Sequence, residues 1–210
     1  QSDIGLQYQH NSLSIMANVF YQSIDNYIVG TPSSNMPANM IANMMGAQQP
    51  LQWSNLDAAL YGADIYLSKM LSSQWQFTTS AQWVKGKLKD AINGEKLPLY
   101  RVAPLSANSG IHYSNNDLDI SLMLTLAASQ TDVSSLQNET STPGYGVWDM
   151  NVKYQFSEAL RLSLTIENML DKAYAQHLGG VNRIMGSDLA VGQKVPEIGR
   201  NVGVYVDYIF

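Results

Sequence analysis

The sequence predicts an all-β fold, an antiparallel up-and-down transmembrane β-barrel, on three observations. Apolar and polar residues alternate with a period of two along several segments, a pattern that only a strand converts into one apolar and one polar face. Short and long connections between these segments also alternate strictly along the chain. Finally, only 14% of the residues are charged, well below the roughly 25–35% typical of soluble surfaces.

The first four candidate strands lie in the amino-terminal part of the chain. The fourth has the clearest pattern, because Trp75, Phe77 and Trp83 share one face while Gln76 and Gln82 share the other. In chain order, the elements are strand 4–10, turn 11–12, strand 13–29, polar stretch 31–55, strand 58–71, turn 72–74, strand 75–85 and polar stretch 86–97.

Five further candidate strands complete the chain. Pro104 lacks a backbone donor, so we expect it near a bulge or an entry point of its strand. In the eighth strand Leu160, Leu162 and Leu164 alternate with polar residues. In chain order, the elements are strand 100–114, turn 115–117, strand 118–126, polar stretch 129–144, strand 145–156, turn 157–159, strand 160–167, long segment 171–198 and strand 199–210.

The connections indicate the kind of sheet. The connections after the first, third, fifth and seventh strands are short, and the connections after the second, fourth, sixth and eighth strands are long. This layout is typical of bacterial outer-membrane barrels, in which long loops face outward and tight turns face the periplasm. The carboxy terminus is then expected at the periplasmic rim. Aromatic residues near strand ends are expected to form girdles at the headgroup level: Trp75, Trp83, Trp148, Tyr154, Tyr208 and Phe210.

Composition excludes several other classes of protein. The chain has no cysteine, which removes disulfide frameworks and thiolate metal sites. A net charge of −5 without a basic stripe argues against nucleic acid as a partner. No apolar run reaches the ~18 residues that a membrane helix needs. The start at Gln1, without an initiator Met or an export segment, leads us to expect a mature piece or a fragment.

The main alternative fold is a soluble β-sandwich or a lipocalin-like barrel. Alternation alone does not determine which face is buried, so it fits that fold as well. The polar faces consist mainly of Ser, Thr, Gln and Asn rather than charged residues. This composition favours the membrane barrel.

Several segments resemble a known family. GADIYLSKML, KGKLKDAINGEKLPLYRVAPLSANSGIHYS, PGYGVWDMNVKYQFSEALRLSLTIENMLDKAYAQHL and GRNVGVYVDYIF together resemble the carboxy-terminal half of a TonB-dependent outer-membrane receptor. The block from Glu167 to Tyr174 resembles its near-terminal N-L-x-D-x-x-Y pattern, and Phe210 resembles the terminal aromatic residue read by the barrel-assembly machinery. AQHLGGVNR and VPEIGRNV look most like the copper receptor branch.

The resemblance implies a bacterial outer-membrane receptor with a barrel of about 22 strands and an amino-terminal plug, importing a scarce ligand with energy passed on by TonB. Residues 1–210 would be the carboxy-terminal part of that barrel, and the plug domain and TonB box would lie upstream, outside this chain. The expected partners are outer-membrane lipid, the TonB complex through that upstream region, and a metal ion or metal chelate. Whether nine strands form an open sheet or a small closed barrel is left open.

A methionine repeat in the first long polar stretch suggests the ligand. Asn-Met recurs every four residues, so on a short helix after Pro37 the methionines would share about one face. Thioethers are soft ligands that select Cu(I). The alternative is a loop helix that packs its methionines as adaptable filler. The predicted metal-ligating residues are Met36, Met40, Met44, Met45, His177 and Met185.

Three classes of function remain. The favoured one is import of a scarce nutrient, most of all copper as the transported ligand, with a siderophore or another metal chelate as the alternative cargo. A passive porin-like barrel is the second class. An outer-membrane enzyme is the third, and we do not expect it, because no catalytic constellation or phosphate loop stands out. No cofactor is expected. The triplet Asn138-Glu139-Thr140 indicates an exposed loop.

Overall fold

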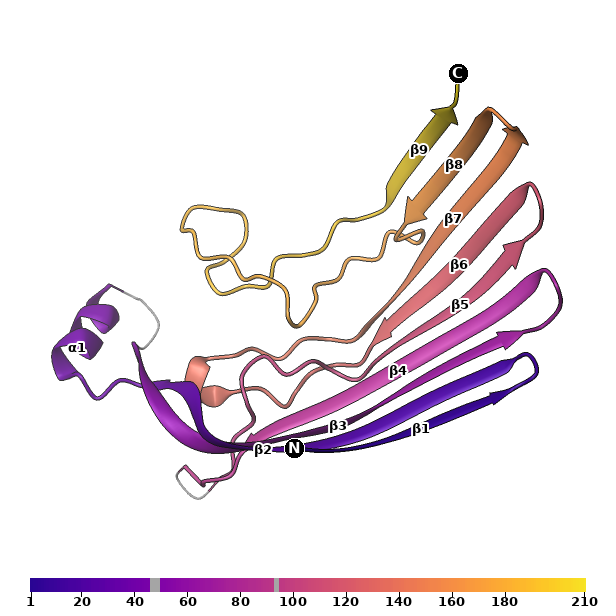
Figure 1. The fold of residues 1–210 in the computed structure, drawn as a ribbon. Coiled ribbons are helices and arrows are strands. Elements are labelled where there is room, and N and C mark those ends of the chain that lie inside the picture. The colour runs from indigo at the N-terminus through magenta and orange to yellow at the C-terminus, as the bar shows by residue number, and fades with distance from the viewer. Residues whose placement is uncertain (46–49, 93–94) are drawn as a thin grey trace.

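A computed structural model describes residues 1–45, 50–92 and 95–210. Residues 46–49 and 93–94, within the polar stretches expected at 31–55 and 86–97, lie outside the described residues. The described chain forms one nine-stranded antiparallel sheet in the order β1 to β9, so every strand pairs with its neighbours in sequence. Figure 1 shows this sheet as a curved, open wall, with β1 and β9 at its two edges. The predicted all-β up-and-down fold is confirmed, and the open sheet settles the question of closure for this chain.

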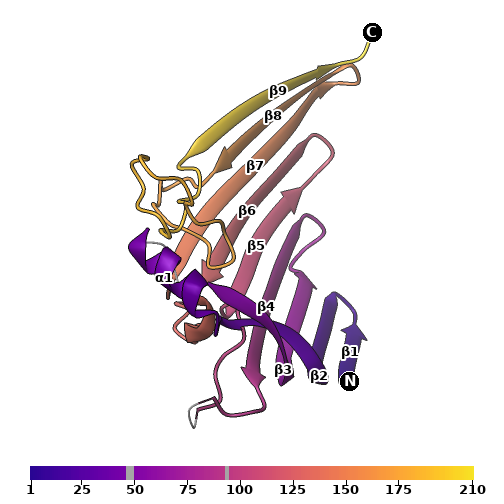
Figure 2. The same cartoon turned by 90° about the vertical axis from the view of Figure 1, so that its left-hand side faces the viewer.

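The two ends of the sheet differ as predicted. Short turns join β1 to β2, β3 to β4, β5 to β6 and β7 to β8 at one end, where the carboxy terminus also lies (Figures 1 and 2). The long loops and helix α1 occupy the opposite end. The bounds are β1 Ser2–His10, β2 Leu13–Pro32, α1 Met36–Met44, β3 Leu51–Met70, β4 Trp75–Leu88, β5 Ser106–Ser114, β6 Leu118–Ala127, the 3-10 turn η1 Ser135–Gln137, β7 Tyr145–Ser157, β8 Leu160–Glu167 and β9 Asn201–Tyr208.

The pairing register places the apolar faces of all nine strands on one side of the sheet. Ala63 of β3 pairs with Val19 of β2 and with Trp83 of β4, and each of these belongs to the apolar set of its strand. The same holds across the other edge, where Leu164 pairs with Val204. Because a slip of one residue would reverse a strand's faces, this agreement along the whole sheet produces one continuous apolar surface suited to lipid.

Aromatic residues border this apolar surface at both ends. Trp75 and Tyr113 pack with their rings tilted by 54° and their centroids 4.9 Å apart near the short turns. Tyr61 and Trp83 meet edge to face at 5.9 Å near the long loops. Trp75 and Trp83 are eight positions apart in β4, about 26 Å along a strand. At the strand tilt of about 35–45° in outer-membrane barrels this corresponds to roughly 19–22 Å along the membrane normal, most of the ~25 Å height of their apolar band.

Several strand boundaries differ from the predictions. β3 begins at Leu51 rather than at 58, and β2 continues to Pro32. These extensions project beyond the apolar band, where neither face has to meet lipid, so no period of two marks them. β5 begins at Ser106 rather than at 100, because Pro104 cannot donate to the ladder and Arg101 adopts a left-handed backbone with φ 59°.

The small hydrophobic core lies at the loop end of the sheet. Ala58, Leu88 and Leu99 are almost fully buried there, and partly buried apolar residues from β2, β3 and the loops surround them. This core fixes the bases of the long loops on the side of the sheet opposite the lipid surface. In the part of the chain that the structure describes, no helix has the length and apolar character needed to span a membrane.

Candidate functional site

Helix α1 lies in the β2–β3 loop, and its local sequence explains where it begins. The Asn35 side chain accepts a hydrogen bond from the Ala38 backbone N–H at 3.1 Å, which satisfies one of the free donors of the first turn. Pro37 stands in that first turn, where its missing N–H costs nothing. The side chain of Asn39 also donates to the Ser33 carbonyl at 2.9 Å and fastens the helix to the end of β2.

The methionines of α1 face solvent. Met36, Met40 and Met44 are spaced by one helical turn, with exposed fractions of 71%, 63% and 85%, and Met45 at the carboxy-terminal cap is equally open. The helix buries Ala42 instead, with Asn39 partly covered beside it. The predicted helix is therefore present, and within this chain its methionines form an open thioether face rather than a packing surface.

The other two predicted ligands lie in the β8–β9 loop. Met185 is 86% exposed, whereas His177 is only 3% exposed. Figure 2 shows that this loop and α1 extend from the same end of the sheet. No group of three or more His, Asp or Glu side chains suited to a metal ion occurs among the described residues. Metal ligation by these six residues stays a prediction.

His177 belongs to a buried polar network centred on Glu139. One carboxylate oxygen of Glu139 lies 3.1 Å from His177 Nε2 and accepts from the Arg101 backbone N–H at 2.9 Å. The other oxygen accepts from the Ser134 backbone N–H at 2.8 Å. On the far side of the ring, His177 Nδ1 lies 3.0 Å from the Thr142 hydroxyl. Because a carboxylate only accepts, Nε2 carries the proton, and in the neutral ring Nδ1 then accepts from the Thr142 hydroxyl.

Two cations complete the network and connect three loops. The Arg101 guanidinium, from the β4–β5 loop, donates to the Leu178 carbonyl, and Lys194 donates to the His177 carbonyl. Burial lowers the pKa of His177 below its ordinary value, and the nearby Lys194 and Arg101 add to that direction. Burial likewise lowers the pKa of Lys194. The β4–β5, β6–β7 and β8–β9 loops are thus joined through neutral His177 and the carboxylate of Glu139.

Sequence reasoning missed Glu139 as a site residue. The triplet around it predicted an exposed loop, yet the carboxylate-bearing side chain is only 4% exposed. Asn138 and Thr140 are exposed as expected, but the Glu139 side chain turns toward the other loops and is covered by them. No local pattern signals the network, since His177 lies 35 positions from Thr142 and 38 positions from Glu139.

The block from Glu167 to Tyr174 has a structural role at the base of the last loop. Asn168 is buried and has a left-handed backbone with φ 49°. Its side chain accepts from the Lys172 backbone N–H at 2.8 Å and donates to the Lys172 carbonyl at 2.9 Å. Asp171 accepts from the Arg200 backbone N–H at 2.8 Å. These contacts hold the end of β8 against the start of β9.

The polar face of the sheet is lined by cross-strand hydrogen bonds. Asn18 donates to Asp64 at 3.4 Å, and the Asn151 amide donates to Thr165 at 2.7 Å. The β8–β9 loop covers part of this face, where a cavity of about 400 Å³ lies between strand residues such as Asp149 and loop residues such as Glu197. This is the face that a closed barrel would turn toward its lumen.

Comparisons with known proteins agree with this architecture. The family described as TonB dependent receptor-like, beta-barrel matches residues 1–169. Among solved structures, "Copper transporter OprC" superposes with a TM-score of 0.83 at 24% identity, over 99% of this chain and 30% of that chain. The ferric yersiniabactin uptake receptor FyuA from Yersinia pestis has a TM-score of 0.69 at 18% identity, over 99% and 29% of the two chains.

A third structure extends the comparison to iron transport. The FrpB iron transporter from Neisseria meningitidis has a TM-score of 0.66 at 15% identity, over 98% of this chain and 30% of that chain. The chain thus spans about 30% of the length of these structures. No curated protein matches the sequence. At such identities the structural likeness establishes the fold.

Proposed function

Because the chain belongs to the TonB-dependent receptor β-barrel family, we propose that it is the carboxy-terminal part of a receptor that imports copper. Barrels of this family lie in the bacterial outer membrane, and the apolar outer surface and aromatic borders of this chain suit that location. Under this proposal the TonB complex supplies energy through an upstream region, and the nine strands contribute one wall of the barrel together with four outward loops.

The open thioether face of α1 is the observation that carries this proposal. Met36, Met40 and Met44 are exposed on one side of the helix, so packing in an apolar gap, the usual role of methionine in a loop, does not explain them. Thioether sulfur binds Cu(I) in preference to hard cations such as Mg²⁺ or Ca²⁺. With Met45 beside them, these side chains present soft ligands to the outside of the cell, where an importer first meets its cargo.

The structural neighbours support a metal-related cargo and leave one alternative. One neighbour is named as a copper transporter, and two others are named as an iron transporter and a siderophore receptor. A metal chelate is therefore the second candidate. The cavity of about 400 Å³ under the β8–β9 loop favours it, because a chelate needs more space than a bare ion.

The experiment is a copper count on the full-length receptor purified from copper-supplemented cells. Elemental mass spectrometry would compare the parent with a variant in which Met36, Met40, Met44 and Met45 are changed to Leu. Met70→Leu is the matched control, since Met70 is also partly exposed but ends β3 at the short-turn rim. We expect bound copper in the parent and the control and a clear loss in the fourfold variant.

Other outcomes would redirect the proposal. Equal copper content in all three proteins would mean that copper is the cargo but binds at a site other than α1. Copper in none of them, together with retention of a ferric chelate, would establish the alternative cargo. His177 and Met185 are tested separately by His177→Gln and Met185→Leu. Loss of copper in His177→Gln would require the loop network to open during capture.

A further inference from the structure

The outer face of β4 changes character at its loop end. Up to Trp83 its outward residues are aromatic or small, but the next two outward positions are Lys85 and Lys87. Successive outward residues lie about 6.6 Å apart along a strand. Both ammonium groups therefore lie just above the aromatic border, at the height of lipid headgroups, on the side of the sheet that faces lipid.

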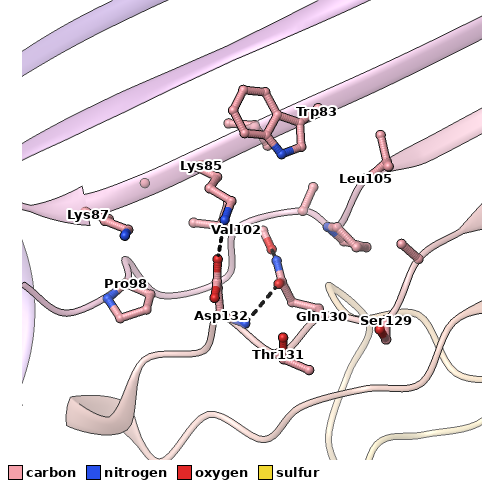
Figure 3. Close-up of a pocket in the computed structure, with 15 residues that line it drawn as sticks. Trp83, Lys85, Lys87, Pro98, Val102, Leu105, Ser129, Gln130, Thr131 and Asp132 are labelled. Carbon is pink, nitrogen blue, oxygen red and sulfur yellow. Dashed lines mark hydrogen bonds and ion pairs between the residues drawn. The ribbon is translucent and has the colours of Figure 1, made fainter.

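Two hollows meet at this position. The upper one, of about 230 Å³, is lined by Trp83, Lys85, Lys87 and by the β4–β5 and β6–β7 loops. Figure 3 shows Lys85 and Asp132 meeting in this hollow, with Trp83 at its border. The lower one, of about 290 Å³, lies on the apolar face around Ala63 and Ala81. Trp83 and Leu105 line both, so the two hollows adjoin each other.

We propose that this pair of hollows binds a phosphate-bearing lipid of the outer leaflet. An acyl chain would occupy the alanine-floored lower hollow, where small side chains leave a groove between larger apolar neighbours. The phosphate would lie in the upper hollow against the ammonium groups of Lys85 and Lys87. Neither part of the site is involved in the proposed copper capture, which concerns a different loop.

The charges of the upper hollow fit a phosphate. Lys85 is paired with Asp132 at 2.8 Å, but both side chains remain 39% and 50% exposed, so the pair is open to exchange with another anion. Lys87 makes no ion pair among the described residues. The two positive charges of the lysines therefore exceed the one negative charge of Asp132. A phosphate bound between the lysines would neutralise the remaining positive charge.

The position of the site favours a lipid over other occupants. The lower hollow opens on the surface that the register assigns to the bilayer, so hydrocarbon already surrounds it. The basic hollow directly above it matches the order of parts in a phospholipid or phosphorylated glycolipid, with a charged head above an apolar chain. A free phosphate ion would gain nothing from the lower hollow.

Native mass spectrometry of the full-length receptor in detergent can test the site. The protein would be titrated with a bis-phosphorylated glycolipid, with the same lipid after removal of its phosphates, and with inorganic phosphate. We expect Lys85→Gln and Lys87→Gln to weaken binding of the phosphorylated lipid by about fivefold each. The control Lys69→Gln, on the same outer face at the opposite rim, should leave binding unchanged.

Two further variants examine each half of the site. Asp132→Asn removes the competing carboxylate and should strengthen binding of the phosphorylated lipid. Ala81→Phe fills the lower hollow and should weaken binding of both lipids, whereas Leu122→Phe, on the lipid face of β6, should not. The heat-dependent mobility of each variant in detergent gels would verify that the barrel is folded.

Several results would overturn the proposal. These are equal binding of the phosphorylated and dephosphorylated lipids, an equal loss in Lys69→Gln, and binding of inorganic phosphate as tight as that of the lipid. Weaker rather than stronger binding in Asp132→Asn would also contradict it. The copper content of these variants should match the parent, which separates this test from that of the proposed cargo.

Discussion

Removing the carboxylate of Glu139 should release three loops at once. Its two oxygens accept from the Arg101 and Ser134 backbone N–H groups and from His177 Nε2, at 2.9, 2.8 and 3.1 Å. Glu139→Ala leaves all three donors without a partner in a place that water does not reach, because the side chains of Glu139 and His177 are 4% and 1% exposed. The three loops then lose the carboxylate at the centre of their shared network.

The size of the effect follows from that burial. One buried donor without a partner costs about 1–3 kcal/mol, and breaking a buried charged contact typically costs about 3–5 kcal/mol in total. The closed arrangement of the loops should therefore lose roughly 3–5 kcal/mol, so that opening becomes at least about 100-fold more frequent. The strands should keep their stability, since the network lies outside the sheet.

Hydrogen exchange measured by mass spectrometry on the full-length receptor can detect this change. Residues 99–105, 134–142 and 174–194 should exchange faster together in Glu139→Ala, while β6 and β7 should not change. Glu158→Ala, in the exposed turn between β7 and β8, is the matched control and should behave like the parent. Faster exchange confined to the loop around position 139 would refute the idea of one shared network.

Three further predictions concern pH, lipid and packing. Burial lowers the pKa of His177 in the closed loops, so the opened loops bind a proton that the closed loops exclude. Loop opening should therefore become more frequent as the pH falls through about 6.5. Hydrogen exchange corrected for its intrinsic rate would measure this, and His177→Gln should abolish the pH dependence. Leu122→Arg on the lipid face should cost about 2–4 kcal/mol in guanidinium unfolding from vesicles, whereas Ser121→Arg on the polar face should cost far less; equal losses would mean that the faces are assigned wrongly. A Cβ on Gly62 would lie 2.4 Å from a backbone oxygen of β4, so Gly62→Ala should cost about 1–3 kcal/mol while Gly5→Ala, with no neighbour closer than 3.8 Å, should be nearly neutral in the same assay.

The fold was predictable wherever the bilayer constrains the sequence. Between the aromatic borders each strand must turn apolar residues outward and polar residues inward, so a period of two is enforced, as in Trp75, Phe77 and Trp83. Outside that band the constraint ends. The first residues of β3, from Leu51 onward, form a long ladder with β2 without any such alternation, and the sequence offers no signal for them.

The site was predictable only in part, for a related reason. The Asn-Met repeat is local, so the helix and the common face of its methionines follow from spacing alone. The network around Glu139 depends on contacts between loops that are distant in sequence. Its residues do not form a recurring sequence pattern that could be recognised in advance. His177 stood out as a possible metal ligand, but only the folded loops reveal that Glu139 and Thr142 engage its two ring nitrogens.

X-ray absorption spectroscopy at the copper edge can show whether the thioethers of α1 bind copper. It would be recorded on the full-length receptor loaded with Cu(I), beside the variant in which Met36, Met40, Met44 and Met45 are changed to Leu. We expect a shell of sulfur scatterers around copper in the parent that is lost or strongly reduced in the variant. A spectrum without sulfur, or the same sulfur shell in both proteins, would contradict capture of copper by α1.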